Sequence, residues 1–383
     1  MTMATMMERA DAVHNGFKPG LEGVVAAETR LSHVDGQNGE LIIGGFPLEA
    51  FAGEVTFEET VFLLWHGELP AQDELAAFRA QLAARRTLPA AVVALLAAAA
   101  QQQLPTMTAL RMAAGALDLD NQPAEENMQQ AARLLARLPT IVATYWRLRQ
   151  GQTPIEPDPT LGHAANYLYL LTGKRPTDTQ VRGMETYLNT VVDHGLNAST
   201  FAARVIIATD TDLTSALIGA LGALKGPLHG GAPGPALDMV FAIGAAEHAE
   251  PYLRAKLEQG ERLMGFGHRI YKVRDPRAAV LSQAAEKMFR AGGGDLALYQ
   301  LATAVEQTAV RLLAEYKPGR NLQTNVEFYT ALLLHGLGLE TDLFTPTFAI
   351  RKRRRLVGHC FEQQATGRLI RPQSRYVGLI RKR

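Results

Sequence analysis

Long stretches of this chain repeat apolar residues at the spacing of an α-helix, and this pattern constrains the fold more than any other feature. Apolar residues recur at i, i+3, i+4 and i+7, most clearly over residues 71–86, 90–103, 125–150 and 295–316. Aromatic residues make up only 7% of the chain while alanine is abundant, which favours closely packed helices over sheet. We therefore predict an all-α protein.

One early segment departs from the helical pattern. Residues 28–46 contain the turn dipeptides Asp35-Gly36 and Asn38-Gly39. Such dipeptides are typical of the tight turns that join antiparallel strands. We predict a small β-hairpin near the N-terminus, as an accessory to the helices.

Two breaks divide the helical pattern. The first spans residues 225–235 (KGPLHGGAPGP) and the second spans residues 317–325 (KPGRNLQTN). A chain of 383 residues is long enough for two domains, or for one large and one small domain. We predict a small helical domain of residues 227–330 and a large helical domain of residues 1–226 and 331–383.

Charge and cysteine content exclude several classes of protein. Lys and Arg total 39 and Asp and Glu total 38, so no overall field favours nucleic acid or a membrane surface. The single cysteine, Cys360, excludes a disulfide framework and a multi-cysteine metal site, and it fits the reducing cytoplasm. No apolar run reaches the length of a membrane span, and the N-terminal residues lack a signal-peptide core.

Two histidines lie in glycine-rich breaks of the pattern. His229 precedes Gly230-Gly231, and His268 follows the sequence Gly-Phe-Gly. Backbone without side chains leaves room for a ligand to approach. Cations follow the second histidine along a short loop and helix start, namely Lys272, Arg274 and Arg277. A single histidine is more often structural, but two in such breaks beside a cation-rich loop favour a functional site.

Two further residues are candidates for chemistry. His194 precedes a glycine, and Glu327 is a lone carboxylate among Val, Phe and Tyr. Apolar surroundings raise the pKa of a carboxyl group and make it a better base. By itself His194 is better explained as a structural residue. For Glu327 the alternative is a surface position, because its sequence neighbours face other ways on a helix. His229, His268 and Glu327 have zinc-binding side chains, but no pair has helical ligand spacing, so we predict no metal.

Seven motifs follow one another along the chain: LSHVDGQNGEL, FLLWHGELP, DHGLNASTF, LKGPLHGGAP, GERLMGFGHRIYKVRDPR, PGRNLQTNVEFY and LFTPTFAI. In order and spacing they resemble the citrate synthase family, in particular its bacterial citrate/2-methylcitrate synthase group, and the resemblance runs from about residue 20 to residue 378. It implies an almost entirely helical two-domain fold whose small domain closes over the substrates. It also implies a homodimer whose active sites are completed across the interface.

The reaction that the resemblance implies condenses acetyl-CoA with oxaloacetate and then hydrolyses the citryl-CoA thioester to citrate and CoA. A CoA thioester is thus the co-substrate, and no cofactor is permanently bound. A thioester methyl group is a weak carbon acid, so removal of its proton needs simultaneous stabilisation of the enolate oxygen. By resemblance Glu327 is the base, neutral His229 donates a hydrogen bond to the thioester oxygen, and His268 polarises the ketone of oxaloacetate.

The resemblance also implies binding roles. The substrate-binding residues that it implies are His194, Arg277, Lys352 and Arg371, the last contributed by the other subunit. The backbone of Gly265, Phe266 and Gly267 is implied to lie along the nucleotide or pantetheine of CoA, with Lys272 near its phosphates.

The chain departs from the family pattern in three places. Glu327 stands where most members have Asp, although some members of the bacterial group carry Glu, and Val191 replaces a histidine of many members. Lys352 stands at an expected arginine, which keeps the charge but loses the bidentate fork. Residues 353–355 are arginines where apolar residues are expected. Burying unpaired guanidinium groups is costly, so we expect an exposed helix, or a remodelled one in which Arg351 substitutes.

Two alternatives stay open beside a citrate synthase, and the departure at Lys352 motivates the second of them. A 2-methylcitrate synthase uses propionyl-CoA, and a hydrophobic pocket discriminates one methylene by only about 1–3 kcal/mol. A catalytically impaired relative would bind the substrates without turnover. The basic run 351–355 lacks the interleaved aromatics of a nucleic-acid patch, so we predict no nucleic-acid partner.

Overall fold

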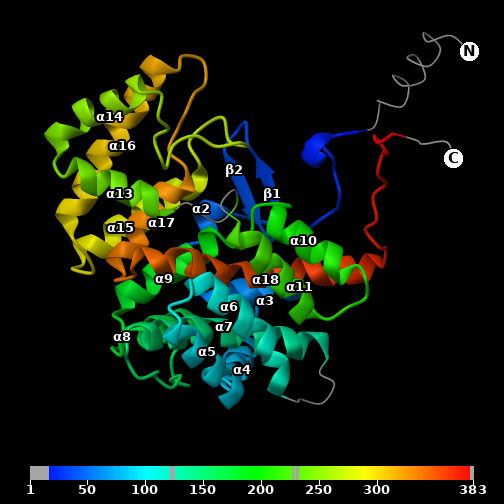
Figure 1. Ribbon diagram of the computed structural model, residues 1–383. Helices are drawn as coiled ribbons and strands as arrows, with labels where there is room; N and C mark the ends of the chain where they lie inside the picture. Colours follow the sequence, from blue (N-terminus) through cyan, green and yellow to red (C-terminus); the bar gives the residue numbers. More distant parts are fainter. Residues whose placement is uncertain (1–16, 121–125, 227–228, 230–232, 380–383) are drawn as a thin grey trace, which may run out of the picture.

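The computed structural model describes residues 17–120, 126–226, 229 and 233–379, and only the backbone of residues 120, 233 and 351–355. Gly230 and Gly231, beside His229, therefore lie outside the described residues. Helices dominate the described part (Figure 1). The prediction of an all-α protein is confirmed.

The four segments with the clearest helical period all form helices. They correspond to α4, α5, α7 and α16, with ends within a few residues of the predicted ones. The helices before the first glycine-rich break are α2 (Leu48–Phe51), α3 (Phe57–His66), α4 (Gln72–Ala83), α5 (Ala90–Gln101), α6 (Thr106–Gly115), α7 (Asn127–Arg149), α8 (His163–Thr172), α9 (Asp178–Thr190), α10 (Ala198–Ile207) and α11 (Leu213–Lys225). Those after it are α13 (Pro233–Ile243), α14 (Ala249–Glu258), α15 (Pro276–Arg290), α16 (Leu296–Tyr316), α17 (Val326–Gly336) and α18 (Phe344–Thr366).

Short 3₁₀ turns complete the helical elements. They are η2 (Pro19–Leu21), η3 (Ala116–Asp120), η4 (Ala246–His248) and η5 (Thr341–Leu343). Among the described helices, none is both long and apolar enough to cross a lipid bilayer.

The predicted hairpin is present and carries a third short strand. Strands β1 (Ser32–Asp35) and β2 (Glu40–Ile43) pair antiparallel, with Ser32 opposite Ile43 and Asp35 opposite Glu40. The third strand, β3 (Phe46–Pro47), pairs with β2. Two residues are too few to give an alternating pattern, so the sequence predicted only two strands.

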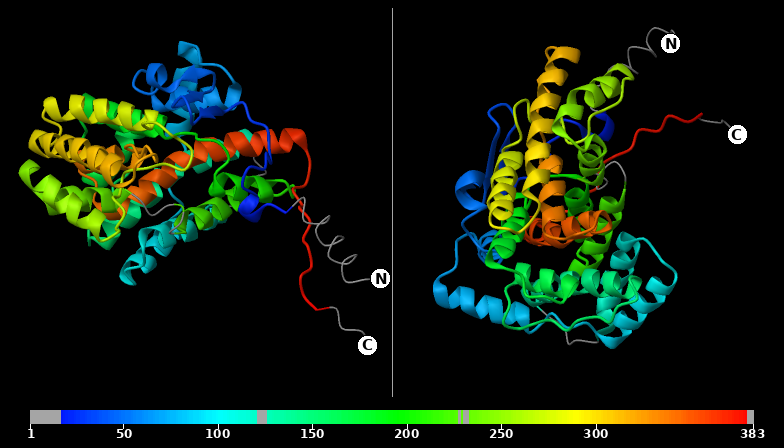
Figure 2. Two further views of the ribbon diagram at one scale, coloured as in Figure 1. Left: turned by 90° about the horizontal axis from the view of Figure 1, so that it is seen from above. Right: turned by 90° about the vertical axis from the view of Figure 1, so that its left-hand side faces the viewer.

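The helices form two groups joined through α18 and α9. Helices α13 to α17 form one lobe at the upper left of Figure 1, where α15 packs on α17 and α14 packs on α16. Helices α4 to α8 lie below, and α18 runs across the middle of the molecule, also in the views of Figure 2. The upper lobe corresponds in the chain to the predicted small domain, whose boundaries stay a prediction.

The core of the lower part surrounds α7. This helix contacts α5, α6, α8 and α18, and Leu134, Leu138 and Ile141 are all fully buried. A helix that is apolar on most of its surface is expected to lie inside a large core. The lower part thus gives α18, which reaches the candidate site, a rigid support.

Candidate active site

Asn325 fixes two segments of the candidate site at once. It is the N-cap of α17, and its Oδ1 accepts a hydrogen bond from the amide of Glu327 at 3.0 Å. Its Nδ2 donates to the carbonyl of Gly267 at 2.9 Å. An asparagine at a helix N-cap normally satisfies helix amides, and here the other end of the amide holds the loop that precedes His268.

Backbone pairing strengthens this link. The amide of Asn325 donates to the carbonyl of Gly265 at 2.9 Å, and the amide of Gly267 donates to the carbonyl of Gln323 at 2.7 Å. Gly265 has φ +87°, and a Cβ there would lie 2.9 Å from the ring of Phe328. Only glycine combines this backbone angle with so close an approach. The loop therefore lies directly on α17.

Arg277 is held by a buried carboxylate. Asp275, the N-cap of α15, accepts from Arg277 Nε at 3.0 Å and from Nη2 at 2.7 Å. Asp275 Oδ2 also accepts from the amide of Val326 at 3.2 Å. Asp275 is 0% exposed and Arg277 is 6% exposed. This bidentate pair fixes the guanidinium at the start of α17, near Glu327.

His268 has a defined tautomer. Its Nδ1 accepts hydrogen bonds from the amides of Ile270 and Tyr271, both at 3.1 Å. An amide only donates, so Nδ1 carries a lone pair and the proton of the neutral ring is on Nε2. Burial, together with the charges of Arg277 and Lys272, lowers the pKa of His268 to about 4 against the opposing effect of Asp275. The ring is therefore neutral near neutral pH.

His268 Nε2 lies 3.2 Å from Nη2 of Arg277. Both groups are donors, so they do not satisfy each other. Two donors that converge in this way present a site for an oxygen acceptor, such as a ketone or a carboxylate.

Tyr271 joins His194 to this group. Its hydroxyl lies 3.1 Å from His194 Nε2, and the rings of His194 and His268 have centroids 5.5 Å apart. The Arg277 guanidinium lies over the Tyr271 ring at 5.8 Å, within cation–π range. Burial raises the pKa of the Tyr271 hydroxyl. Tyr271 was not among the predicted site residues, although it lies in the motif that contains His268.

His229 also has a fixed orientation. Its Nε2 accepts from the amide of Ser199 at 3.3 Å and lies 3.1 Å from the Ser199 hydroxyl. Because the amide only donates, Nε2 carries a lone pair and the neutral ring has its proton on Nδ1. Ser199 is in the first turn of α10, which Asn197 caps.

One cavity of about 220 Å³ brings the candidate catalytic residues together. Its lining includes His229, His268, Arg277 and Glu327, which come from separate segments. The other lining residues are Asn197, Asn325, Val326, Thr330, Thr345 and Phe348. Burial raises the pKa of Glu327, Arg277 partly offsets this, and Asp275 adds to it. A carboxyl group in this position is suited to general-base chemistry.

A second cavity of about 530 Å³ is also lined by His268, Asn325 and Glu327. The predicted residues Gly265, Phe266 and Gly267 line it. So do four cations that the sequence did not identify: Arg262, Arg269, Lys317 and Arg320. These four cations lie inside or next to the recognised motifs, and that position could have identified them from the sequence. Four cations around one cavity suit a ligand that carries phosphates.

Three predicted residues with described side chains, His194, Lys272 and Arg371, are not in the lining of either cavity. Lys272 is exposed, and its Nζ donates to the carbonyl of Arg269 at 3.3 Å. Arg371 is exposed in the extended tail after α18. The side chain of Lys352 lies outside the described part. The backbone of α18 continues through residues 351–355, and position 352 follows the cavity residue Phe348 by one helical turn.

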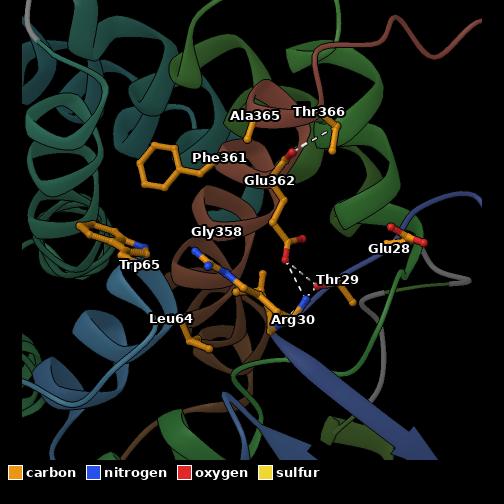
Figure 3. Close-up of a pocket in the computed structure, with 11 residues that line it drawn as sticks. Glu28, Thr29, Arg30, Leu64, Trp65, Gly358, Phe361, Glu362, Ala365 and Thr366 are labelled. Carbon is orange, nitrogen blue, oxygen red and sulfur yellow. Dashed lines mark hydrogen bonds between the residues drawn. The ribbon is translucent and has the colours of Figure 1, made fainter.

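A larger cavity of about 570 Å³ lies elsewhere, between the segment before β1 and the end of α18 (Figure 3). None of the predicted site residues whose side chains are described lines it. Glu362 is bonded to its neighbours in this wall: its Oε1 accepts from Thr29 Oγ1 at 3.1 Å and from the amide of Arg30 at 2.9 Å. In the described part of the chain, no three His, Cys, Asp or Glu side chains are grouped so as to hold a metal ion.

A family model for the citrate synthase C-terminal domain matches residues 20–373. The chain belongs to the citrate synthase family. It is 39% identical over 371 residues to the citrate synthase of Haloferax volcanii, covering 94% of this chain and 96% of that one. It is 38% identical over 383 residues to a 2-methylcitrate synthase of Mycobacterium tuberculosis, covering 99% and 93%.

The fold agrees with this membership. The solved structure of a ternary complex of the Thermoplasma acidophilum citrate synthase with carboxymethyl coenzyme A and oxaloacetate superposes with a TM-score of 0.85. It is 28% identical, and the match covers 96% of this chain and 97% of that one. The protein is thus a transferase of the citrate synthase type, and the predicted resemblance is confirmed.

Proposed function

We propose that this protein condenses acetyl-CoA with oxaloacetate and hydrolyses the resulting citryl-CoA to citrate and CoA. The observation that carries the proposal is the cavity of about 220 Å³ lined by His229, His268 and Glu327 from three separate segments. The similar Thermoplasma acidophilum enzyme was solved with oxaloacetate and a CoA derivative, which supports the same substrate pair here.

Glu327 is the proposed base that removes a proton from the thioester methyl group. Its raised pKa makes it a stronger base than an ordinary exposed glutamate. The extra methylene relative to Asp moves a carboxylate by about one C–C bond length. The backbone amide of Glu327 donates a hydrogen bond to Asn325 Oδ1. This bond holds the first turn of α17, so the longer side chain starts from a fixed backbone.

His229 is the proposed donor to the thioester oxygen as the enolate develops. His229 Nε2 accepts a hydrogen bond from the amide of Ser199, which supports a neutral ring with its proton on Nδ1. A neutral imidazole that donates a hydrogen bond stabilises an oxyanion without transferring its proton. The new carbon–carbon bond then forms between the enolate carbon and the ketone carbon of oxaloacetate, and water cleaves the thioester in the second stage.

Oxaloacetate is proposed to bind where His268 and Arg277 converge. Nε2–H of His268 would polarise the ketone, and the Arg277 guanidinium would pair with a carboxylate. His194, linked through Tyr271, would contact the same substrate. Lys352 stays a predicted partner for a carboxylate, because position 352 follows Phe348 on the face of α18 that reaches the cavity.

CoA is proposed to occupy the cavity of about 530 Å³. The backbone of residues 265–267 and the cations Arg262, Lys317 and Arg320 line it, which suits pantetheine and phosphate groups. Lys272 stays a prediction for the phosphates. No permanently bound cofactor is part of the proposal.

A homodimer is proposed to complete the site through Arg371. The tail after α18 is extended, and its apolar residues Leu369, Tyr376, Val377 and Leu379 are between 55% and 85% exposed. Apolar side chains left uncovered in this way suit contact with a second copy. The cytoplasmic location rests on the single cysteine and stays a prediction.

A 2-methylcitrate synthase is the second candidate, because the match to such an enzyme of Mycobacterium tuberculosis covers 99% of this chain. Thiol release from acetyl-CoA and from propionyl-CoA, each with and without oxaloacetate, tests both candidates. An enzyme-only blank corrects for Cys360, which is buried. Oxaloacetate-dependent release is expected, and the ratio of the two rates selects the acyl group. Substrate binding by folded protein without release would contradict catalysis and favour the binding-only alternative.

A further inference from the structure

Strand β1 contacts both loops of the proposed oxaloacetate site. At its first residue, Ser32 Oγ accepts a hydrogen bond from the amide of Gly195 at 3.1 Å. Beyond its last residue, the carbonyl of Gly36 accepts from the amide of Lys272 at 2.8 Å. Gly195 directly follows His194, and Lys272 directly follows Tyr271. One strand therefore connects the two loops whose side chains meet at the His194–Tyr271 contact.

The tip of the hairpin packs on the second loop without spare room. A Cβ at Gly36 would lie 2.4 Å from the carbonyl oxygen of Ile270, and a Cβ at Gly39 would lie 2.6 Å from a methyl carbon of Val273. Gly36 does not have a left-handed backbone angle. Lack of space alone therefore requires glycine at position 36. Figure 1 shows β1 and β2 beside the loops of the upper lobe.

Hydrogen bonds hold both the turn of the hairpin and the chain that enters β1. Asp35 Oδ1 accepts from the amides of Gln37 and Asn38, and its Oδ2 accepts from Asn38 Nδ2 at 2.8 Å. The chain entering β1 is anchored to α18, because Glu362 Oε1 accepts from Thr29 Oγ1 and from the amide of Arg30 (Figure 3). The strand is thus fixed before its first residue and after its last.

We propose that β1 and the turn after it are a positioning element for the oxaloacetate side of the site. They set the distance between the His194 loop and the loop containing His268 and Tyr271. This inference rests on the proposed function. The acyl-CoA side has its own support, since residues 265–267 pair with residues 323–325. Disturbing the hairpin should therefore weaken oxaloacetate binding selectively.

Gly36→Ala tests the close approach, with Gly53→Ala as the matched control. Gly53 also lacks a left-handed angle, and a Cβ there meets no atom within 4 Å. For Gly36→Ala we expect the KM for oxaloacetate to rise about tenfold or more while the KM for acyl-CoA changes less than about twofold. Gly53→Ala should match the parent protein. Equal changes in both KM values, or no change in either, would overturn the proposal.

Ser32 provides a second, milder test. Ser32→Ala removes the acceptor for the Gly195 amide, and we expect the KM for oxaloacetate to rise about three- to tenfold. Ser32→Thr retains the hydroxyl and should restore most of the loss. If Ser32 contributes only to general stability, both Ser32 variants will have a lower melting temperature, and the KM for oxaloacetate will change no more than the KM for acyl-CoA.

Hydrogen exchange separates failure of this proposal from failure of the proposed function. In the parent protein the amides of Gly195 and Lys272 should be protected, and Gly36→Ala should speed exchange at Lys272 without speeding it at Gly267. This readout needs no turnover, so it decides the role of β1 even if the protein releases no thiol. Unchanged exchange at Lys272 in Gly36→Ala would overturn the positioning role.

Discussion

The cavities of about 220 and 570 Å³ differ in how their polar groups are bonded. In the cavity of about 220 Å³, the donors His268 Nε2 and Arg277 Nη2 face each other at 3.2 Å. In the cavity of about 570 Å³, Glu362 accepts from Thr29 and Arg30 (Figure 3). It also accepts from Arg204 behind the wall. In the larger cavity the carboxylate is bonded to its own neighbours, whereas in the smaller one two donors converge on one point. Converging donors, and not volume, mark the site.

Glu327→Gln should give the largest effect on activity. Loss of a general base lowers turnover by about 10²–10⁴-fold, and the amide keeps the shape of the side chain. The measurement is kcat for oxaloacetate-dependent thiol release. A loss of less than about tenfold would contradict the assignment of Glu327 as the base.

The same variant has a pH signature. Burial raises the pKa of Glu327 above 4.5 in the folded protein, so the folded state binds the proton more tightly than the unfolded state. The ionised carboxylate therefore destabilises the fold as pH rises from the unfolded pKa through the folded one. Glu327→Gln should gain melting temperature relative to the parent as pH rises through this window. A difference that shrinks with rising pH would contradict the raised pKa.

His268→Gln should come next, with roughly a 10²-fold loss in kcat/KM for oxaloacetate. The ring pKa is about 4 in the folded protein against 6.5 for an ordinary histidine. Unfolding therefore takes up a proton between these values, and stability falls as pH falls from 6.5 to about 4. Thermal melts across this window should show a shallower slope for the variant. Equal slopes would contradict the lowered pKa.

Arg204→Leu tests the wall behind the larger cavity. Arg204 is 2% exposed and donates to His359 Nδ1 and to Glu362 Oε2, both at 2.9 Å. Leaving buried partners uncompensated costs about 3–5 kcal/mol, which urea unfolding measures. Arg175→Leu is the control, because Arg175 is a largely exposed partner of Asp158 and its loss should cost under about 1 kcal/mol. Equal costs would contradict a structural network here.

Filling the larger cavity should have the smallest effect. Ala365 is exposed at its wall, and Ala365→Phe adds a ring there. Because no proposed substrate contact lies in this cavity, kcat and both KM values should stay within about twofold of the parent. A selective loss of activity would show that the larger cavity takes part in substrate binding.

Much of the fold was readable from the sequence, because the helical period of α4, α5, α7 and α16 sets their position. The capping role of Asn197 follows from the same local rules. The grouping of His229, His268 and Glu327 was expected from the motifs and the family resemblance. Periodicity alone does not bring together segments that are far apart in the chain.

Other parts of the site depend on tertiary contacts that no local pattern encodes. Tyr271 is an ordinary core tyrosine by sequence, and only its distance to His194 gives it a place in the site. Asp275 reads as a helix cap, yet it also fixes Arg277. The hairpin was predicted as an accessory, and its packing on the loop after Tyr271 depends on the space beside Gly36.

The most direct test of the central claim measures two properties of His229→Ala together: oxaloacetate affinity by calorimetry and thiol release from acetyl-CoA. His229 is proposed to act on the thioester oxygen alone, so turnover should fall by about 10²–10³-fold while the Kd for oxaloacetate stays within about twofold. Strong residual turnover, or a Kd that rises together with the loss of turnover, would contradict the assignment of His229 to the thioester.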